Sequence, residues 1–417
     1  MIATILFSAC ILSYCCHHGY AWGQEADQIP NDVKILNQIF PDTAMHPAFR
    51  CPDMSPSPTI PTSVEFVKAA DIKVIAALGD SLTTAIAANG STILSLPVEY
   101  RHVSWSIGGY GTYEDVITLA NILKLFNPTL LGPAPTWTVK GQPTSINETG
   151  FNFAVTGHNS LNISEQTRHM INTFKSYPGM NFKEDWKLVT VLIGMNDICD
   201  YCKNKTLFSA DNYIYHITEM LDTMMNEVPR MIVNIVQILP MESLREVQRP
   251  TVGCLFQKKF CSCLVLPEDN SSELEEVRQI NIEFQAGGAP AQRPFLQTGL
   301  CCDPSALFTT SPTTKTACWF HIYTTGEIDL SYFSADCFHF RVKGHEELAK
   351  GLWNNMFQPE GEKELIDTFS DPVRLICPPK EHPYIYTRPR ALSSGPPPTY
   401  LTMPALILLI LTMSAAN

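Results

Sequence analysis

Three short apolar runs constrain the fold of this chain most, because each is too short for a typical helix and shows little alternation of apolar and polar residues. They are residues 73–78 (KVIAAL), 188–193 (LVTVLI) and 231–238 (MIVNIVQI). A continuous run rich in branched side chains is typical of a strand that is buried on both faces, as in a parallel sheet covered by helices.

Segments with apolar residues at helical spacing separate or follow these runs. The expected helices are 113–126, 164–174, 213–228, 273–284 and 342–356, and two further short strands are expected at 103–107 and 151–155. Strands that alternate with helices predict an α/β fold with a mostly parallel sheet and helices on both faces.

The N-terminal residues have the pattern of a secretory signal. An apolar run over 2–16 gives way to small and polar residues, which predicts a signal peptide over 1–23, with a buried N-terminal helix as the alternative. Residues 24–63 are rich in proline and predict an extended lead-in that wraps over the surface. The folded domain is then expected over 64–377.

The C-terminal residues have the pattern of a membrane attachment signal. A proline-rich linker over 378–395 ends in small residues, and the mostly apolar stretch 396–417 is followed by no Lys or Arg. This pattern favours a glycosylphosphatidylinositol signal, with a single-pass membrane tail as the alternative. Together the two ends predict a protein of the secretory pathway, anchored at the extracellular face of the plasma membrane.

Cysteines and glycosylation motifs agree with that location. Sequons lie at Asn89, Asn147, Asn162, Asn204 and Asn270, and the cysteines beyond the leader are Cys51, Cys199, Cys202, Cys254, Cys261, Cys263, Cys301, Cys302, Cys318, Cys337 and Cys377. In an oxidising compartment most of them should form disulfides. The dense group over 254–318 predicts a disulfide-pinned insertion at the rim of the domain. Cys199 and Cys202 are expected to bond to each other; no second C-x-x-C supports the alternative of half a zinc site.

Charge excludes one class of partner. The formal net charge is -12 and no long run of Lys or Arg occurs. The chain therefore lacks the basic surface with which proteins bind nucleic acid, and no nucleic acid is expected among its partners.

Two of the three segments that could carry chemistry directly follow expected strands. Residues 79–82 (GDSL) follow the first run and residues 194–197 (GMND) follow the run 188–193. Carboxyl ends of parallel strands meet at one edge of a sheet, which is where such folds place their sites. Ser81 offers a hydroxyl nucleophile there, and Asn196 offers an N–H donor for an oxyanion. Either segment alone is commonly only a surface turn.

The third segment is residues 336–339 (DCFH). Asp336 lies three residues before His339, so its carboxylate can bond the imidazole Nδ1–H and leave Nε2 free to act as a base. A lone D-x-x-H is usually a loop ion pair. The three segments in this order favour a Ser-His-Asp site instead.

These segments, with Gly109 between the first two, resemble the four sequence blocks of the GDSL or SGNH hydrolase superfamily. Residues 49–82, and also 105–109 and 121–128, are similar to the phospholipase B branch of that superfamily. The resemblance implies a flavodoxin-like α/β fold.

The resemblance also implies roles for individual residues. Ser81 would be the nucleophile, His339 the base and Asp336 the acid, with Asp197 as the alternative acid. The oxyanion hole would be formed by the backbone N–H groups of Ser81 and Gly109 and by the Asn196 side chain. No metal and no organic cofactor would be needed.

The implied function is hydrolysis of acyl esters in phospholipids, lysophospholipids or other lipid esters at a membrane surface. Two alternatives stay open at this point. The chain could be a glycosylated surface module that keeps the fold without catalysis, or an esterase that removes acetyl groups from carbohydrates or other small esters.

Overall fold

The computed structural model describes residues 45–90, 92–247, 249–287, 296–299, 329–359, 363 and 373–387. The expected signal peptide, the first part of the lead-in, the end of the linker and the C-terminal signal all lie outside these residues. So do Cys301, Cys302 and Cys318 and most of the second half of the expected insertion. The fold described below belongs to the unit His46–Asn417.

The central sheet is parallel, in the order β1-β4-β5-β6. Its strands are β1 (Ile72–Gly79), β4 (Trp186–Leu192), β5 (Met231–Val236) and β6 (Leu296–Gly299). Nearly every residue of the first three strands is buried, as the continuous apolar runs predicted. The runs were informative because side chains on both faces of a parallel sheet must leave water.

Beside β1, the chain pairs only through isolated bridges, from Val74 to Leu131 and from Ala77 to Asn152. The expected strand 151–155 is therefore reduced to a short extended stretch, which forms three backbone hydrogen bonds with β1, two at Ala77 and one at Gly79. The expected strand 103–107 is wrong, because the 3₁₀ helix η4 (Arg101–Val103) and a following turn fold its backbone back on itself. Its apolar side chains are buried, but they reach the core from a turn.

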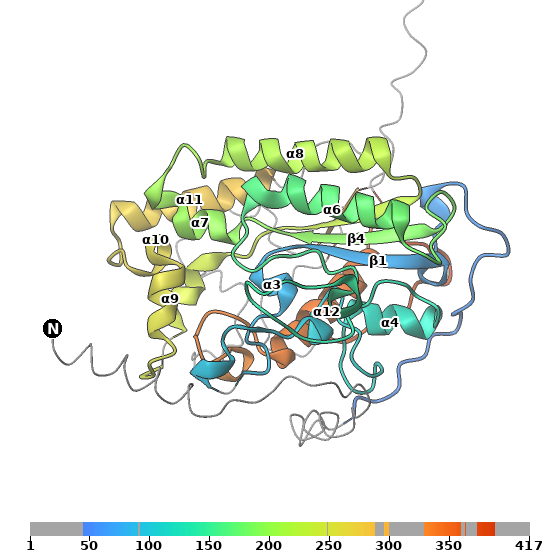
Figure 1. Cartoon of the computed structure of the whole chain (residues 1–417), viewed down its shortest axis with the longest axis horizontal. Helices are drawn as coiled ribbons and strands as arrows, with labels where there is room; N and C mark the ends of the chain where they lie inside the picture. Colours follow the sequence, from blue (N-terminus) through green and yellow to red (C-terminus); the bar gives the residue numbers. More distant parts are fainter. Residues whose placement is uncertain are drawn as a thin grey trace, which may run out of the picture. The chain divides into compact units, whose positions relative to one another are not determined.

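Helices cover both faces of the sheet. They are α3 (Ser81–Thr84), α4 (Leu119–Phe126), α5 (Ile146–Thr149), α6 (Ile163–Ser176), α7 (Met195–Asp200), α8 (Ala210–Glu227), α9 (Leu255–Phe260), α10 (Ser262–Val265), α11 (Ser272–Gly287) and α12 (Val342–Met356). Figure 1 shows α6 and α8 on one side of β1 and β4, with α4 and α12 on the other. The sequence therefore predicted the layers correctly.

Shorter elements connect these layers. The two-residue strands β2 (Val98–Glu99) and β3 (Thr138–Val139) pair antiparallel. The remaining 3₁₀ helices are η1 (Val64–Phe66), η2 (Ala69–Asp71), η3 (Ile93–Ser95), η5 (Ser160–Asn162), η6 (Tyr201–Lys203), η7 (Met241–Glu246) and η9 (Leu330–Tyr332). The helix expected at 113–126 begins only at Leu119, because the Thr118 hydroxyl accepts the Asn121 N–H and caps it there.

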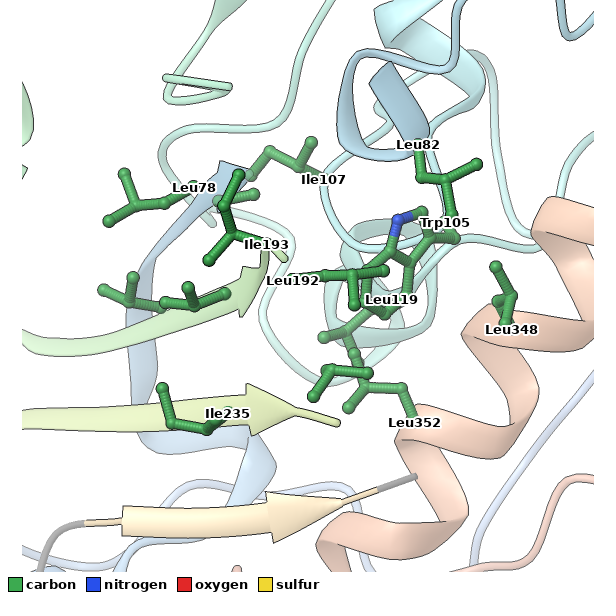
Figure 2. Close-up of a cluster of buried hydrophobic side chains, with 14 of the residues drawn as sticks. Leu78, Leu82, Trp105, Ile107, Leu119, Leu192, Ile193, Ile235, Leu348 and Leu352 are labelled. Atoms are coloured by element: carbon green, nitrogen blue, oxygen red, sulfur yellow. The ribbon is translucent and has the colours of Figure 1, made fainter. Parts of the chain in front are cut away.

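The core lies between the sheet and the helices that carry its connections. Figure 2 shows the fully buried Trp105 between the carboxyl ends of the strands and α12, whose Leu348 and Leu352 point toward it. Trp105 belongs to the turn that sequence analysis assigned to a strand. Its large side chain links the start of the domain to its last helix, and burial of such a group is a major part of core stability.

Part of the expected linker belongs to the fold. Ile385 is fully buried and its N–H donates to the Val67 carbonyl, while the Tyr386 N–H donates to Met356. The disulfide between Cys51 and Cys377 joins this segment to the lead-in. The folded domain therefore extends about ten residues beyond its expected end at 377.

Disulfide pairing differs from the expectation in one respect. Cys199 bonds to Cys261 and Cys202 bonds to Cys263, so the expected bond between Cys199 and Cys202 is wrong. A fourth disulfide joins Cys254 to Cys337. Two cysteines on successive turns of one helical segment reach cysteines of a second segment more easily than they reach each other. Their spacing in the sequence therefore gave the wrong pairing.

Candidate active site

Ser81 is the first residue of α3, directly beyond the end of β1. The side chain of Asp80 caps this helix by accepting the Leu82 N–H at 2.9 Å. Gly79 is required at the strand end, because a Cβ atom there would lie 2.5 Å from the Leu192 carbonyl oxygen. The turn therefore presents the Ser81 hydroxyl at the edge of the sheet, with the side chain mostly buried.

Gln166, on the buried face of α6, fixes this turn from the other side. Its side chain accepts the Gly79 N–H at 2.9 Å and donates to the Gly79 carbonyl at 2.8 Å. The same amide contacts His158 Nδ1 at 3.1 Å. Sequence analysis missed Gln166, although a buried glutamine on the apolar face of a helix was a usable signal.

Asn196 and Asp197 lie in the first turn of α7, directly beyond β4. The Asn196 amide donates one hydrogen to the His158 carbonyl at 2.7 Å, which leaves its second hydrogen available. The Asp197 carboxylate accepts the N–H and the hydroxyl of Ser160 and is fully buried. Asp197 is thus bonded to the loop before α6, whereas the described bond to the His339 imidazole comes from Asp336.

Asp336 and His339 form the contact that their spacing predicted. Asp336 Oδ2 lies 2.7 Å from His339 Nδ1, and Asp336 Oδ1 accepts the backbone N–H groups of Phe338 and His339 at 3.1 and 3.0 Å. Burial alone would raise the pKa of Asp336, but the imidazole and these donors outweigh it and hold the pKa below its usual range. The carboxylate is therefore ionised and fixes the imidazole.

Hydrogen bonds bring the His339 loop against the turn that follows Ser81. The Ser334 hydroxyl donates to the Ala87 carbonyl at 2.9 Å, and the Val342 N–H donates to the Ala88 carbonyl at 3.2 Å. These bonds lie on both sides of His339. They join two loops that are some 250 residues apart in sequence.

One pocket joins these segments. Ser81, Asn196 and Phe338, the neighbour of His339, all line it, and its empty volume is about 490 Å³ including the part open to solvent. The remaining lining residues are Asp80, Leu82, Met195, Leu239, Pro240, Met241, Leu244, Phe333 and Phe340. The wall is therefore largely apolar, and its polar residues are Asp80, Ser81 and Asn196.

Gly109 is placed differently from the other expected residues. Its N–H donates to the Ala134 carbonyl at 2.9 Å, and Gly109 is not among the described residues that line the pocket. As the chain is folded here, this donor is occupied. The Ser81 N–H, by contrast, has no backbone acceptor within the described part of the chain.

Two further carboxyl groups near the pocket are perturbed by burial. Burial raises the pKa of Asp80 to about 7, although the Leu82 N–H and the charge of His339 oppose this. Burial likewise raises the pKa of Asp197 to about 6, against the bonds from Ser160. Asp80 Oδ2 is buried without a hydrogen-bond partner, which favours the neutral acid.

The described residues carry neither a metal-binding cluster nor a membrane-spanning helix. Across the described ranges, no cluster of three or more His, Cys, Asp or Glu side chains is arranged to hold a metal ion. No helix in that part of the chain has the length and apolar character needed to cross a membrane.

Comparisons with known proteins agree on one family. Residues 75–352 match the family model described as GDSL-like lipase/acylhydrolase. Phospholipase B1, membrane-associated, is 38% identical over 347 residues in Mus musculus and 38% identical over 352 residues in Homo sapiens. Each alignment covers 81% of this chain but 23% of the relative, so the chain spans about a quarter of the length of these relatives.

A solved variant of an acetyl xylan esterase from Geobacillus stearothermophilus is also similar, at 12% identity over 68% of this chain and 96% of that one. Its TM-score of 0.30 is too low to support an argument. The family match covers most of the chain and includes the segments of Ser81, Asn196 and His339. The chain belongs to the GDSL-like lipase/acylhydrolase family.

Proposed function

We propose that this chain is a phospholipase B-like serine esterase that hydrolyses the acyl esters of phospholipids or related lipids. The pocket at Ser81 carries the proposal, because apolar side chains surround a hydroxyl, an amide and, one residue from Phe338, an imidazole held by a buried carboxylate. An acyl chain fits such a wall, and its ester carbonyl would stop at the polar end.

In the proposed reaction the Ser81 hydroxyl attacks the ester carbonyl while His339 Nε2 takes its proton. Asp336 keeps the imidazole oriented and stabilises its charged form. The negative oxygen of the tetrahedral intermediate would accept the Ser81 N–H and the second Asn196 hydrogen. His339 then protonates the leaving alcohol, and water, activated by the same imidazole, releases the fatty acid.

Gly109 can contribute to the oxyanion hole only if its N–H becomes free. Its N–H would have to leave the Ala134 carbonyl before it could donate to the intermediate. Two donors remain without it. Acyl transfer by a serine, a histidine and an aspartate is complete in itself, so the proposed chemistry assigns no step to a metal or cofactor.

The two alternative functions are less well supported. An acetylesterase for sugars would need a polar wall to bind hydroxyl groups, whereas nine apolar residues line this pocket: Leu82, Met195, Leu239, Pro240, Met241, Leu244, Phe333, Phe338 and Phe340. A surface module without catalysis has no need of a buried Asp336–His339 pair, since apolar residues in its place are often as stable or more so.

The proposed location is the extracellular face of the plasma membrane, with the chain held by its C-terminal signal. Four disulfides among the described residues support an oxidising compartment. The names of the relatives, which include "membrane-associated", support attachment to a membrane.

A substrate panel tests the function. The purified chain is incubated with phosphatidylcholine, lysophosphatidylcholine and acetylated xylan, and the released acids are identified by mass spectrometry. We expect fatty acid release from both lipids, its loss in Ser81→Ala, and no loss in the surface variant Ser176→Ala. Acetate release without fatty acid release would contradict the proposal, and so would lipid hydrolysis that persists in Ser81→Ala.

A further inference from the structure

The short helix α9 has one buried and one exposed side. Cys254, Gln257 and Cys261 face inward and are buried. Leu255 is 61% exposed on the other side, together with Lys258. The helix lies at the end of the sheet where α3 and α7 begin, beside α10, as Figure 1 shows.

The buried side of α9 holds the loop that carries His339. Gln257 donates to the Cys337 carbonyl at 2.8 Å, and the disulfide between Cys254 and Cys337 lies one turn away. The chain also passes so close at Gly253 that a Cβ atom there would lie 1.9 Å from the Ala335 carbonyl oxygen. The loop before His339 therefore rests directly on α9.

The same helix is adjacent to the pocket. The Phe260 ring lies 5.8 Å from the ring of Phe338, which lines the pocket, and 6.0 Å from the ring of His339. A lipid that reaches the Ser81 pocket from a bilayer must bring the bilayer surface close to this rim. Through Phe260, α9 lies beside the pocket wall at Phe338.

The chemistry of the exposed side suits a phospholipid surface. Val252, just before α9, and Leu255, its first residue, are 62% and 61% exposed, so two large apolar side chains lie on the surface three residues apart. Lys258 and Lys259 are exposed as well. Lys258 lines a second pocket with Glu242, Glu246 and Asp269, but neither lysine forms an ion pair with these or any other described acidic residue. Apolar side chains that enter the headgroup layer beside lysines that attract lipid phosphates are typical of interfacial helices.

We infer that the exposed side of α9, with Val252, Leu255, Lys258 and Lys259, is the surface by which this chain docks on a phospholipid bilayer next to its site. The inference deepens the proposed function and rests on it. Docking there delivers the substrate to the Ser81 pocket, and it uses side chains that take no part in the reaction itself.

The experiment compares bilayer and monomeric substrates with the purified full chain. The variants are Leu255→Glu and the pair Lys258→Glu and Lys259→Glu, with Tyr215→Glu as a control because Tyr215 is 57% exposed on the distant α8. Binding to phosphatidylcholine vesicles with and without phosphatidylserine is measured by sedimentation. Hydrolysis is measured on the same vesicles and on a soluble short-chain ester. All variants share the same termini, so any binding by the termini cancels between them.

We expect Leu255→Glu to lower vesicle binding and vesicle hydrolysis about tenfold, since a buried leucine side chain is worth at least that factor. Replacing both lysines should lower vesicle binding and vesicle hydrolysis at least about fivefold, and only when the vesicles contain phosphatidylserine. Soluble-ester hydrolysis should not change, and Tyr215→Glu should change nothing.

Unchanged vesicle binding in both α9 variants would overturn the inference. An equal loss on the soluble ester would also overturn it, because α9 would then only support the His339 loop. If the proposed function is wrong, the unaltered chain will hydrolyse neither the vesicles nor the soluble ester. Vesicle binding by the α9 variants would still show whether α9 docks on the bilayer.

Discussion

Exchanging Asp336 or Asp197 for asparagine decides which carboxylate serves His339. In Asp336→Asn the retained oxygen can still accept the two backbone N–H groups that Asp336 Oδ1 holds. The new amide group then faces His339 Nδ1 in place of the oxygen that lay 2.7 Å away. It donates to Nδ1, so the proton moves to Nε2, where the base is needed.

A base held in the wrong tautomer lowers kcat by about 10⁴-fold in serine hydrolases of this kind, which corresponds to about 5.5 kcal/mol of activation free energy. Asp197→Asn should differ sharply. Asp197 Oδ1 accepts the Ser160 hydroxyl and, at 3.3 Å, the Ser160 N–H, so an asparagine oxygen at that place can still accept both, and only the 3.0 Å bond to Oδ2 is lost. We expect its kcat to stay within about tenfold of the unaltered chain, since no contact of His339 changes.

The assay is hydrolysis of a soluble short-chain ester at saturating concentration, with thermal unfolding measured on each variant to confirm folding. A loss near 10⁴-fold in Asp197→Asn and a mild effect in Asp336→Asn would refute this reasoning. The geometry around Ser160 would then describe a resting arrangement, and Asp197 would be the acid.

Three further predictions concern stability and the support of the site. The pKa of Asp80 is about 7 in the folded chain, above its usual 3.8. Its contribution to stability is therefore fully present below pH 3.8 and is lost as the pH rises toward 7, and the loss amounts to up to about 4 kcal/mol. Asp80→Asn should therefore flatten the pH dependence of urea unfolding between pH 4 and 7, and an unchanged slope would contradict the pKa. Leu352 is 1% exposed and lies beside Trp105. Leu352→Ala should lower the free energy of unfolding in urea by about 2–5 kcal/mol, and a loss below about 1 kcal/mol would contradict the packing. Gln257→Leu should lower kcat about tenfold, because it frees the Cys337 carbonyl in the loop of the base and also the carbonyls of Leu244, which lines the pocket, and Val247. Asn127→Leu, which removes a buried amide bond to the far end of β1, should lower only the melting temperature; equal kcat in both variants would contradict this.

The sequence predicted those parts of the fold that depend on local pattern. The continuous apolar runs became β1, β4 and β5, and the expected helix 342–356 has the bounds of α12. Both patterns arise because buried residues recur at a fixed spacing along one element, and that spacing is visible in the sequence. The contact of Asp336 with His339 was equally local, since it spans three residues.

What the sequence could not predict depends on partners that are distant along the chain. The apolar pattern around Trp105 indicated that this residue is buried, but no neighbouring residue indicated that the backbone there forms a turn and not a strand. The partner of Cys199 lies 62 residues away, and that of Cys254 lies 83 residues away. The Gly109 N–H is likewise occupied by Ala134, a residue in another loop.

Backbone conformation near the site was also beyond reach. Ala85, Ala87 and Cys337 adopt φ angles of 53°, 59° and 57°, in the left-handed region that favours glycine. No local pattern predicts alanine or cysteine there. Such residues persist where surrounding bonds fix them. Here the Ser334 hydroxyl bonds the Ala87 carbonyl and joins the Ser81 turn to the His339 loop, while Gln257 of α9 bonds the Cys337 carbonyl.

Covalent labelling tests the central claim most directly, namely that Ser81 is a nucleophile activated by His339. The purified chain is treated with a fluorophosphonate probe, digested, and analysed by mass spectrometry. The account predicts one adduct, on the peptide that contains Ser81, which is absent in Ser81→Ala and strongly slowed in His339→Ala. Labelling of a different serine at the same rate in Ser81→Ala would contradict it.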